Sequence, residues 1–262
     1  TNAESYVAWQ WKVDGGTIAN NTDGDLTTSV QVNQTAGCSI ITYTGIDPIE
    51  PLDIGHGLGA VPEFWFIKSR QIASKQWGVY HQGMNAVPQN YYMTLHTTNA
   101  ASAASSWWRN EAPTSTIIKT GEQDDVNRAG SNYICYAWTS IQGFSKFGKY
   151  IGTGNRDGSP FIYTGFQPAF IMVKNTAAAT GWAMFDNKRT IANGDMDYLA
   201  ADRAAAESNA GFSHTDPVDF VSNGFKIMNS DAWMNTSGAR YIYIAFAQHP
   251  FVTSTGVPTT AR

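Results

Sequence analysis

The stretch Tyr133–Ser140 reads Tyr-Ile-Cys-Tyr-Ala-Trp-Thr-Ser, an uncharged run of aromatic and β-branched residues. Such a run is typical of a β-strand that is buried on at least one face. The same pattern, a Tyr, then a β-branched residue, then Trp or Phe five residues after the Tyr, returns in Tyr6–Trp11 and in Tyr241–Phe246. Three occurrences with one internal spacing predict a repeated structural unit.

The chain from about residue 39 to residue 251 is a duplication. Residues 59–68 match residues 165–174 without a gap, at a shift of 165 − 59 = 106. Other matching pairs, at shifts from 182 − 77 = 105 to 241 − 133 = 108, are Trp77 with Trp182, Tyr92 with Tyr198, Asn127 with Asn235, and Tyr133 with Tyr241. We therefore expect unit 1 at residues 39–142 and unit 2, with a C-terminal tail, at residues 143–262.

Both units predict short strands separated by Gly, Asn, Asp and Pro, at the density expected of a sandwich. The strands are expected near residues 39–44, 63–69, 77–81, 91–96, 115–119 and 132–141, and near residues 160–164, 169–174, 182–186, 218–228 and 240–248. Asn223-Gly224 predicts a tight hairpin, because both residues tolerate positive φ. The Ala-rich residues 198–208 favour a loop. The predicted fold is all-β, with two tandem, internally repeated, jelly-roll-like β-sandwich units.

The first copy of the strand pattern has no repeat unit before it. Because this strand closes the repeat in both units, Tyr6–Trp11 is expected to be the last strand of a preceding unit. Residues 1–38 would then hold that strand and a linker, with a short polar strand at Thr28–Val32. An orphan strand of this kind needs a sheet to join.

The composition narrows the possible partners. The formal net charge is −4, only 15% of residues are charged, and no basic patch is evident, so nucleic acid is not expected as a partner. No apolar run of about 18 residues is present, so no transmembrane helix is expected, and residues 1–4 do not resemble a signal peptide. The two cysteines, Cys38 and Cys135, have no metal-ligand spacing, and Cys135, inside the apolar strand, is expected to be a buried free thiol.

The candidate ligand-binding residues are aromatic side chains in irregular segments and one histidine. Trp107, Trp108 and Arg109 follow one another, and Trp233 lies in a similar segment. Adjacent residues of a strand point to opposite faces, so only one of the two neighbouring tryptophans need be buried. His56 stands in a Gly-rich run and could contact a ligand, although such a run is more often a turn that leads into a strand. Trp77 and Trp182 are equivalent across the repeat and are expected in the core.

We expect no catalytic residues, no metal and no cofactor. Glycosidases need two carboxylates at a fixed separation, and the six Glu show no strand pattern that would direct them into one cleft. No nucleophile elbow, Walker loop or His-based metal motif is present. Residues 21–25 and 124–127 concentrate oxygen ligands that could hold Ca²⁺, but neither forms a full ligand loop, and Asp- and Asn-rich turns are common.

Several motifs together resemble a duplicated domain that is common in marine and cyanobacterial tailed phages. They are the runs at residues 39–45, 55–59, 143–148, 163–166, 222–226 and 241–246. This domain occurs toward the C-terminus of long virion proteins, often behind a concanavalin-like lectin domain whose end Tyr6–Trp11 resembles. The resemblance implies a virion structural protein, assembled in the host cytoplasm, that contacts other virion proteins and copies of itself. Phage fibres are usually homotrimers, so a trimer is the implied symmetry.

The function expected from the sequence is binding without catalysis. The chain would form part of a tail fibre, tailspike or head fibre whose loops and exposed aromatic side chains bind a host surface glycan. A capsid-surface decoration protein that stabilises the particle is the first alternative. An enzyme that degrades cell-surface polysaccharide is the second, and the sparse carboxylates argue against it.

Overall fold

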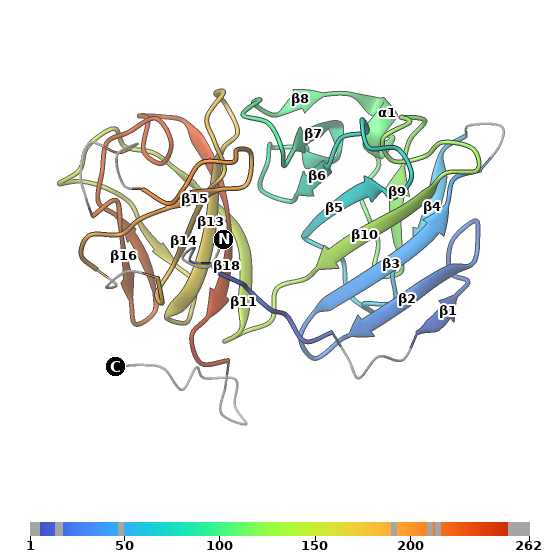
Figure 1. Ribbon diagram of the computed structural model, residues 1–262, viewed down its shortest axis with the longest axis horizontal. Helices are drawn as coiled ribbons and strands as arrows, with labels where there is room; N and C mark the ends of the chain where they lie inside the picture. Colours follow the sequence, from blue (N-terminus) through green and yellow to red (C-terminus); the bar gives the residue numbers. More distant parts are fainter. Residues whose placement is uncertain are drawn as a thin grey trace.

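The computed structural model describes residues 6–13, 18–46, 50–189, 193–208, 212 and 216–250. The predicted all-β class is confirmed, because the described residues form antiparallel sheets and almost no helix (Figure 1). The helical elements in these ranges are the four-residue α1 (Ser105–Trp108) and the 3₁₀ turn η1 (Pro88–Asn90).

Unit 1 is a sandwich of a large and a small sheet. The large sheet has the strand order β1-β2-β3-β10-β5-β6-β7-β8. Its strands are β1 (Ala19–Asn21), β2 (Thr28–Asn33), β3 (Cys38–Thr44), β5 (Phe64–Ser69), β6 (Gly78–His81), β7 (Tyr91–Thr94), β8 (Ser102–Ala103) and β10 (Asn132–Trp138). The small sheet pairs β4 (Leu52–Gly55) with β9 (Ile117–Thr120). Alternate residues of both sheets, among them Ile41, Ile54 and Tyr133, enclose the core between them.

Unit 2 repeats this arrangement. The large sheet runs β11-β18-β13-β14-β15 and the small sheet runs β12-β17-β16. The strands are β11 (Ser145–Ile151), β12 (Phe161–Tyr163), β13 (Pro168–Asn175), β14 (Ala183–Asp186), β15 (Leu199–Ala200), β16 (Val218–Val221), β17 (Gly224–Ile227) and β18 (Arg240–Ala247). The central order β3-β10-β5-β6 of unit 1 therefore corresponds to β11-β18-β13-β14 of unit 2. Among the described residues of unit 2, its sheet has no counterpart of β1 and β2.

A pair of stacked tyrosines marks the same position in each unit. Tyr43 stacks on Tyr133 with ring centroids 5.2 Å apart, and Tyr150 stacks on Tyr241 at 4.9 Å. The hydroxyl of Tyr43 donates to the carbonyl of Val126 at 2.5 Å. In unit 2, Tyr150 donates to the carbonyl of Met234 at 2.7 Å. Repeated sequence motifs thus make repeated contacts.

The two large sheets face each other and join the units. A third cluster of buried side chains draws on both of them, with Phe64 and Trp138 from unit 1 and Phe147 and Ile242 from unit 2. The remaining members include the following residues: Val13, Cys38, Val79, Met84, Met93, Phe170, Met172, Trp182, Ile244 and Phe246. Each unit therefore buries both faces of its large sheet, one against its own small sheet and one against the other unit.

Hydrogen bonds cross this junction. His81 Nε2 donates to the carbonyl of Tyr243 at 3.1 Å, and His81 Nδ1 accepts from Gly83 N at 2.9 Å. Trp182 Nε1 donates to the carbonyl of Thr94 at 3.1 Å. These bonds satisfy polar groups that the packing of the two units removes from water.

The strands predicted within the two repeat units are present, with ends that differ by a few residues, and the Ala-rich residues 198–208 form no helix. The hairpin between β16 and β17 is also present, but its turn is Ser222-Asn223, and Gly224 is the first residue of β17. Neither Asn223 nor Gly224 has positive φ. Gly224 is required for another reason, since a Cβ there would lie 2.1 Å from the carbonyl oxygen of Ile162.

The prediction that Tyr6–Trp11 forms a strand is wrong. Residues 6–13 form no strand, and they cross from unit 2 to unit 1 (Figure 1). Val13 is buried in the third cluster, and its carbonyl accepts a bond from Gln31 Nε2 at 2.8 Å. Residues 19–33, which the sequence suggested were largely linker, form β1 and β2 and extend the large sheet of unit 1.

Candidate functional site

Trp107 and Trp108, expected at the surface, are core residues. Their exposed fractions are 2% and 1%. They lie on the short helix α1 and not on a strand, so the alternation that would expose one of them does not apply. Trp107 stacks on Tyr92 at 4.2 Å, and Trp108 meets Trp65 edge-on at 5.4 Å. Neither side chain can stack on a ligand in this arrangement.

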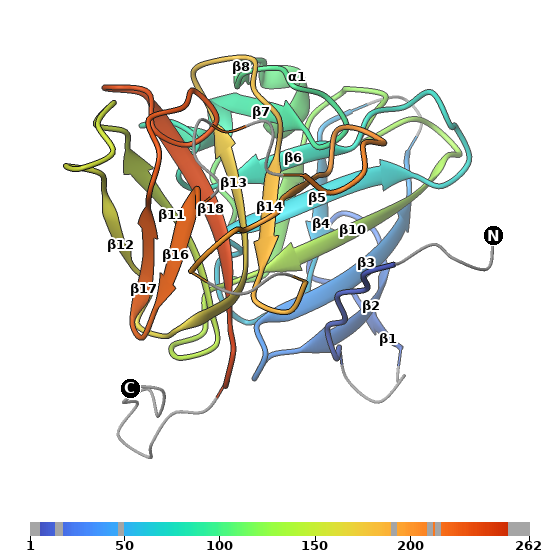
Figure 2. The ribbon, with the colours of Figure 1, turned by 60° about the vertical axis from the view of Figure 1, so that its left-hand side comes forward.

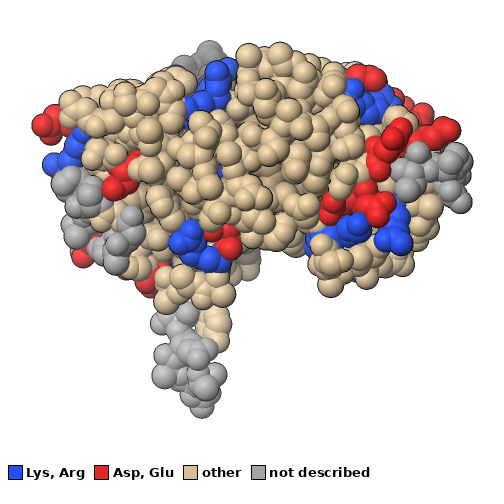
Figure 3. Space-filling model, turned by 90° about the horizontal axis from the view of Figure 1, so that it is seen from above, with Lys and Arg blue, Asp and Glu red and all other residues tan. Residues whose placement is uncertain are grey.

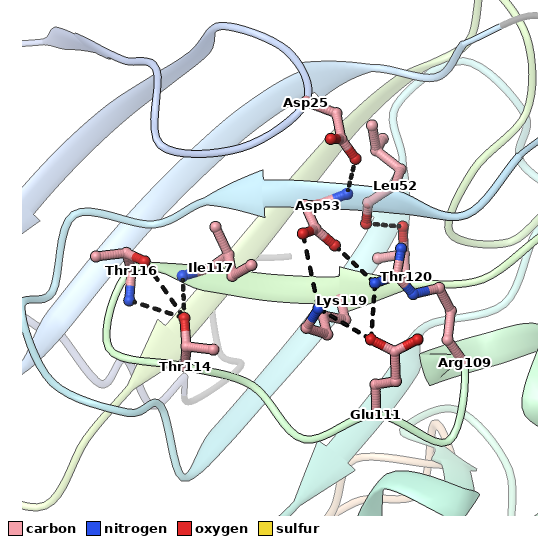
Figure 4. Close-up of polar contacts among 10 residues, drawn as sticks. All are labelled: Asp25, Leu52, Asp53, Arg109, Glu111, Thr114, Thr116, Ile117, Lys119 and Thr120. Carbon is pink, nitrogen blue, oxygen red and sulfur yellow. Dashed lines mark hydrogen bonds and ion pairs between the residues drawn. The ribbon is translucent and has the colours of Figure 1, made fainter.

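Arg109 belongs to a charge network on the outer face of the small sheet of unit 1 (Figure 4). Its guanidinium lies 3.0 Å from both Asp53 and Glu111. Lys119 Nζ lies 2.9 Å from Glu111 and 3.7 Å from Asp53. Hydrogen bonds from Lys119 and Arg109 lower the pKa of the Glu111 carboxyl. Both cations of this network are already paired, which makes it a structural contact between β4, β9 and the loop after α1.

His56 and Trp233 are also held by internal contacts. His56 is fully buried, with Nδ1 accepting from Leu58 N at 3.1 Å and Nε2 lying 3.2 Å from the carbonyl of Thr114. Burial lowers the pKa of His56, against the opposing effects of the Thr114 carbonyl and Asp23. Trp233 is half-buried, and the guanidinium of Arg203 covers its ring at 4.6 Å. The five candidates do not form one site.

In the acidic turns considered for Ca²⁺, side-chain oxygens accept hydrogen bonds from the chain itself. Asn21 Oδ1 accepts from Asp23 N at 3.0 Å, and Asp25 Oδ2 accepts from Asp53 N at 2.7 Å. Asp125 Oδ1 accepts from Gln76 N at 2.5 Å. Within the described ranges, no group of three or more His, Cys, Asp or Glu side chains is placed to hold a metal ion. Cys38 and Cys135 are buried free thiols, as predicted for Cys135.

An aromatic groove lies where residues 6–13 cross the edge of unit 2. We name it the junction groove and define it by five aromatic side chains: Trp9, Trp11, Phe144, Phe170 and Phe246. It holds about 470 Å³ and continues into a hollow of about 300 Å³ that shares Phe144. These volumes fall in the range of small-molecule sites.

The aromatic rings of the junction groove support one another. Trp9 packs edge-on against Phe170 at 5.2 Å, and Trp11 packs edge-on against Phe246 at 5.1 Å. The side chain of Trp11 stays 38% exposed, and that of Trp9 is half-buried. The rings are thus fixed by packing while part of their surface faces solvent.

Polar side chains border the junction groove. Gln10, Lys12 and Asn33 lie along it, and Gln142 borders the adjoining hollow. A further hollow, of about 690 Å³, shares Ala8 with the groove and is bordered by Arg189 and Glu207, which pair with each other at 2.9 Å. Figure 3 shows the molecule from above the view of Figure 1, and on this face basic and acidic groups are interspersed and large areas carry no charge.

The sequence pattern did not predict the junction groove, because Trp9 and Trp11 fit the pattern of a buried strand. The alternation in Trp9-Gln10-Trp11 was the available signal. That alternation gives two rings on one side of an extended segment whether or not the segment joins a sheet. What the rings pack against was not visible in the sequence.

Residues 1–250 match the family model described as "Domain of unknown function (DUF7483)". The chain belongs to this family. Searches of curated proteins and of solved structures find no match. The family description assigns no activity, so the function of this member has to be argued from its own residues. In the described part of the chain, no helix is long and apolar enough to cross a membrane.

Proposed function

We propose that this chain is a non-catalytic binding module of a tailed-phage virion appendage, and that the junction groove binds a host surface glycan. The virion assignment rests on the resemblance of the repeated motifs. The observation that carries the binding role is the pair Trp9 and Trp11, which are fixed by Phe170 and Phe246 and still partly open to solvent. The expected environment is the virion surface, and no cofactor takes part.

The chemistry of the groove suits a sugar. The face of a pyranose ring carries C–H groups that pack against the electron-rich face of an indole. Hydroxyls at the rim of the sugar need hydrogen-bond partners, and the amides of Gln10 and Gln142 supply donors and acceptors at the border of the groove. Rings that are already fixed lose little conformational entropy when a ligand binds.

The test is glycan-array binding and host-cell adsorption with the full chain and three variants. Trp11→Ala should weaken binding about tenfold or more, equal to about 1.4 kcal/mol, because it removes the stacking surface. Trp11→Phe should keep part of the affinity. Val61→Ala, at an exposed apolar residue outside the groove, is the control and should bind as the unaltered chain does.

Each alternative function predicts a different result. If the unaltered chain binds neither cells nor glycans, the binding proposal is wrong, and localisation on the capsid in virion images would identify a decoration protein. If the chain depolymerises host polysaccharide, the non-catalytic assignment fails. Equal binding by the Trp11→Ala variant would place the glycan outside the junction groove.

A further inference from the structure

The edge of the small sheet is closed in unit 1 and open in unit 2. In unit 1 the edge strand is β4, whose outward-facing backbone groups belong to Asp53 and Gly55. Asp25 N donates to the carbonyl of Asp53, and Asp53 N donates to Asp25 Oδ2, at 3.0 and 2.7 Å. Thr28 Oγ1 donates to the carbonyl of Gly55 at 2.8 Å. The segment just before and at the start of β2 therefore seals this edge.

The corresponding strand of unit 2 is β12, at the end of the sheet β12-β17-β16. Ile227 N donates to the carbonyl of Pro160, and Thr164 N donates to that of Asn223. In an antiparallel ladder, bonding positions alternate, so the backbone groups of Phe161 and Tyr163 point away from β17. Among the described residues no other segment bonds to them. The described part of unit 2 has no strands that correspond to β1 and β2, which explains the difference.

The side chains differ in the same way. Asp53 faces Lys119 across the small sheet of unit 1, and Phe161 faces Lys226 at the corresponding place in unit 2. Phe161 is 49% exposed and Tyr163 is 60% exposed, and both lie on the outer face of the sheet. Gly224 is opposite Tyr163 and adds no side chain to this face. Unit 2 thus presents an aromatic pair and an open strand edge together.

We propose that β12 is a self-association surface, at which two copies of this chain pair their β12 strands antiparallel about a two-fold axis through Ile162. In that register the two outward-facing backbone positions meet, Phe161 of each copy opposite Tyr163 of the other. An open edge is a template for strand addition, and cross-strand aromatic pairs stabilise antiparallel sheets. A two-fold interface must be self-complementary, which this three-residue register satisfies.

The proposed contact extends beyond β12. Figure 2 shows β11 on the same side of unit 2 as β12, and β11 is likewise the edge strand of its sheet. Its last residue, Ile151, is 50% exposed. Each of these two edge strands of unit 2 therefore carries at least one exposed large apolar side chain. Pairing would convert two three-stranded sheets into one six-stranded sheet and remove both open edges.

The test is the mass of the full chain in solution, measured by light scattering and sedimentation over a concentration series. The unaltered chain should have the mass of two copies. Phe161→Lys places a charge on the edge and should give a monomer with an unchanged circular dichroism spectrum. Val87→Lys, at an exposed apolar residue outside β12, should remain a dimer.

A second variant tests the proposed contact by cross-linking it. The double change Phe161→Cys and Tyr163→Cys places a cysteine of each copy opposite a cysteine of the other, at a backbone separation that allows a disulfide. Since Cys38 and Cys135 are buried, mild oxidation should give a linked dimer. A monomeric or trimeric unaltered chain, or no linked dimer, would overturn the proposal. The proposal would also be overturned if the unaltered chain were a monomer and lost its glycan binding when Phe161 and Tyr163 were changed.

This inference does not rest on the glycan-binding role, because β12 and the junction groove share no residue. Failure of one test leaves the other untouched. It also differs from the homotrimer implied by the resemblance to phage fibres, since a two-fold contact through β12 predicts a dimer.

Discussion

Gly152 follows Tyr150 by two residues, just as Gly45 follows Tyr43. A Cβ on Gly152 would lie 2.3 Å from the carbonyl oxygen of Thr236, and one on Gly45 would lie 2.2 Å from that of Arg128. Because both glycines lack a side chain, the end of a strand can contact the loop that supports the stacked tyrosines. Gly152 does so after β11, and Gly45 does so after β3. Neither is needed for positive φ. This requirement for space is a property of single residues that the duplication made visible.

We predict that Gly152→Ala lowers the free energy of unfolding by about 1–3 kcal/mol, because the backbone must move away from the new methyl group. Gly158→Ala is the matched control. Its Cβ would meet Asn155 at an ordinary 3.4 Å, so its effect should be within about 0.5 kcal/mol. Urea unfolding of both variants measures the difference, and equal midpoints would contradict the steric explanation.

The four-residue helix α1 is stabilised by its contacts with the rest of unit 1. A helix of this length is not stable alone in water. It is held because Trp107 and Trp108 enter the core of unit 1, and because Gly121 N and Gln123 N donate to the carbonyls of Trp107 and Ser106, both at 2.8 Å. The side chain of Trp107 lies so close to Gly78 that any Cβ there would collide with its ring. α1 therefore acts as an anchor for the loop that carries Arg109.

Replacing a buried tryptophan and a partly exposed one should distinguish a core residue from a residue of the binding surface. Trp108→Ala should lower the free energy of unfolding by about 3–5 kcal/mol, since it leaves a large cavity in a packed core. Trp11→Ala should cost about 1 kcal/mol, because that ring is partly exposed at the junction groove. Denaturant midpoints measure both values. A loss at Trp11 as large as that at Trp108 would mean that Trp11 is a core residue.

The whole molecule is one body because the two large sheets bury a common cluster. His81 lies inside this junction, fully buried and bonded to Tyr243 of the other unit. Burial lowers the pKa of His81 to about 4, which the Tyr243 carbonyl opposes and Lys149 reinforces. The unfolded chain has an ordinary histidine pKa near 6.5. Between pH 6.5 and 4 the unfolded state therefore binds a proton that the folded state does not.

Stability should consequently fall as the pH falls through that window, by about 1.4 kcal/mol per pH unit from this one group. We expect the melting temperature to drop between pH 7 and pH 4.5, and the drop to be smaller in His81→Gln, whose amide can still donate to Tyr243. His56 is also buried and adds to the slope in both proteins. His96→Gln, at an exposed position, serves as the control. If the melting temperature of His81→Gln changed with pH as steeply as that of the unaltered chain, protonation of His81 would not be a cause of the pH dependence.

The amino-acid sequence alone determined the fold class, the repeat and most of the strands. Alternation, turn residues and repeated spacings are local properties, and the Tyr133 strand, like its counterpart at Tyr241, lies between two other strands of its large sheet. The third copy, at Tyr6, led to a wrong strand prediction. Two aromatic rings on one side of an extended segment give the same sequence pattern whether the segment joins a sheet or packs across the ends of other strands.

Only the tertiary structure decided which side chains are accessible. It buried Trp107, Trp108 and His56, left Trp11 open at the junction groove, and exposed Phe161 and Tyr163 on β12. Each of these outcomes depends on what packs against a segment: the second unit, the residues before β2, or no other described segment of the chain. A sequence pattern shows that a face is apolar, but burial also requires a second surface, and the pattern of one segment does not say which surface that is.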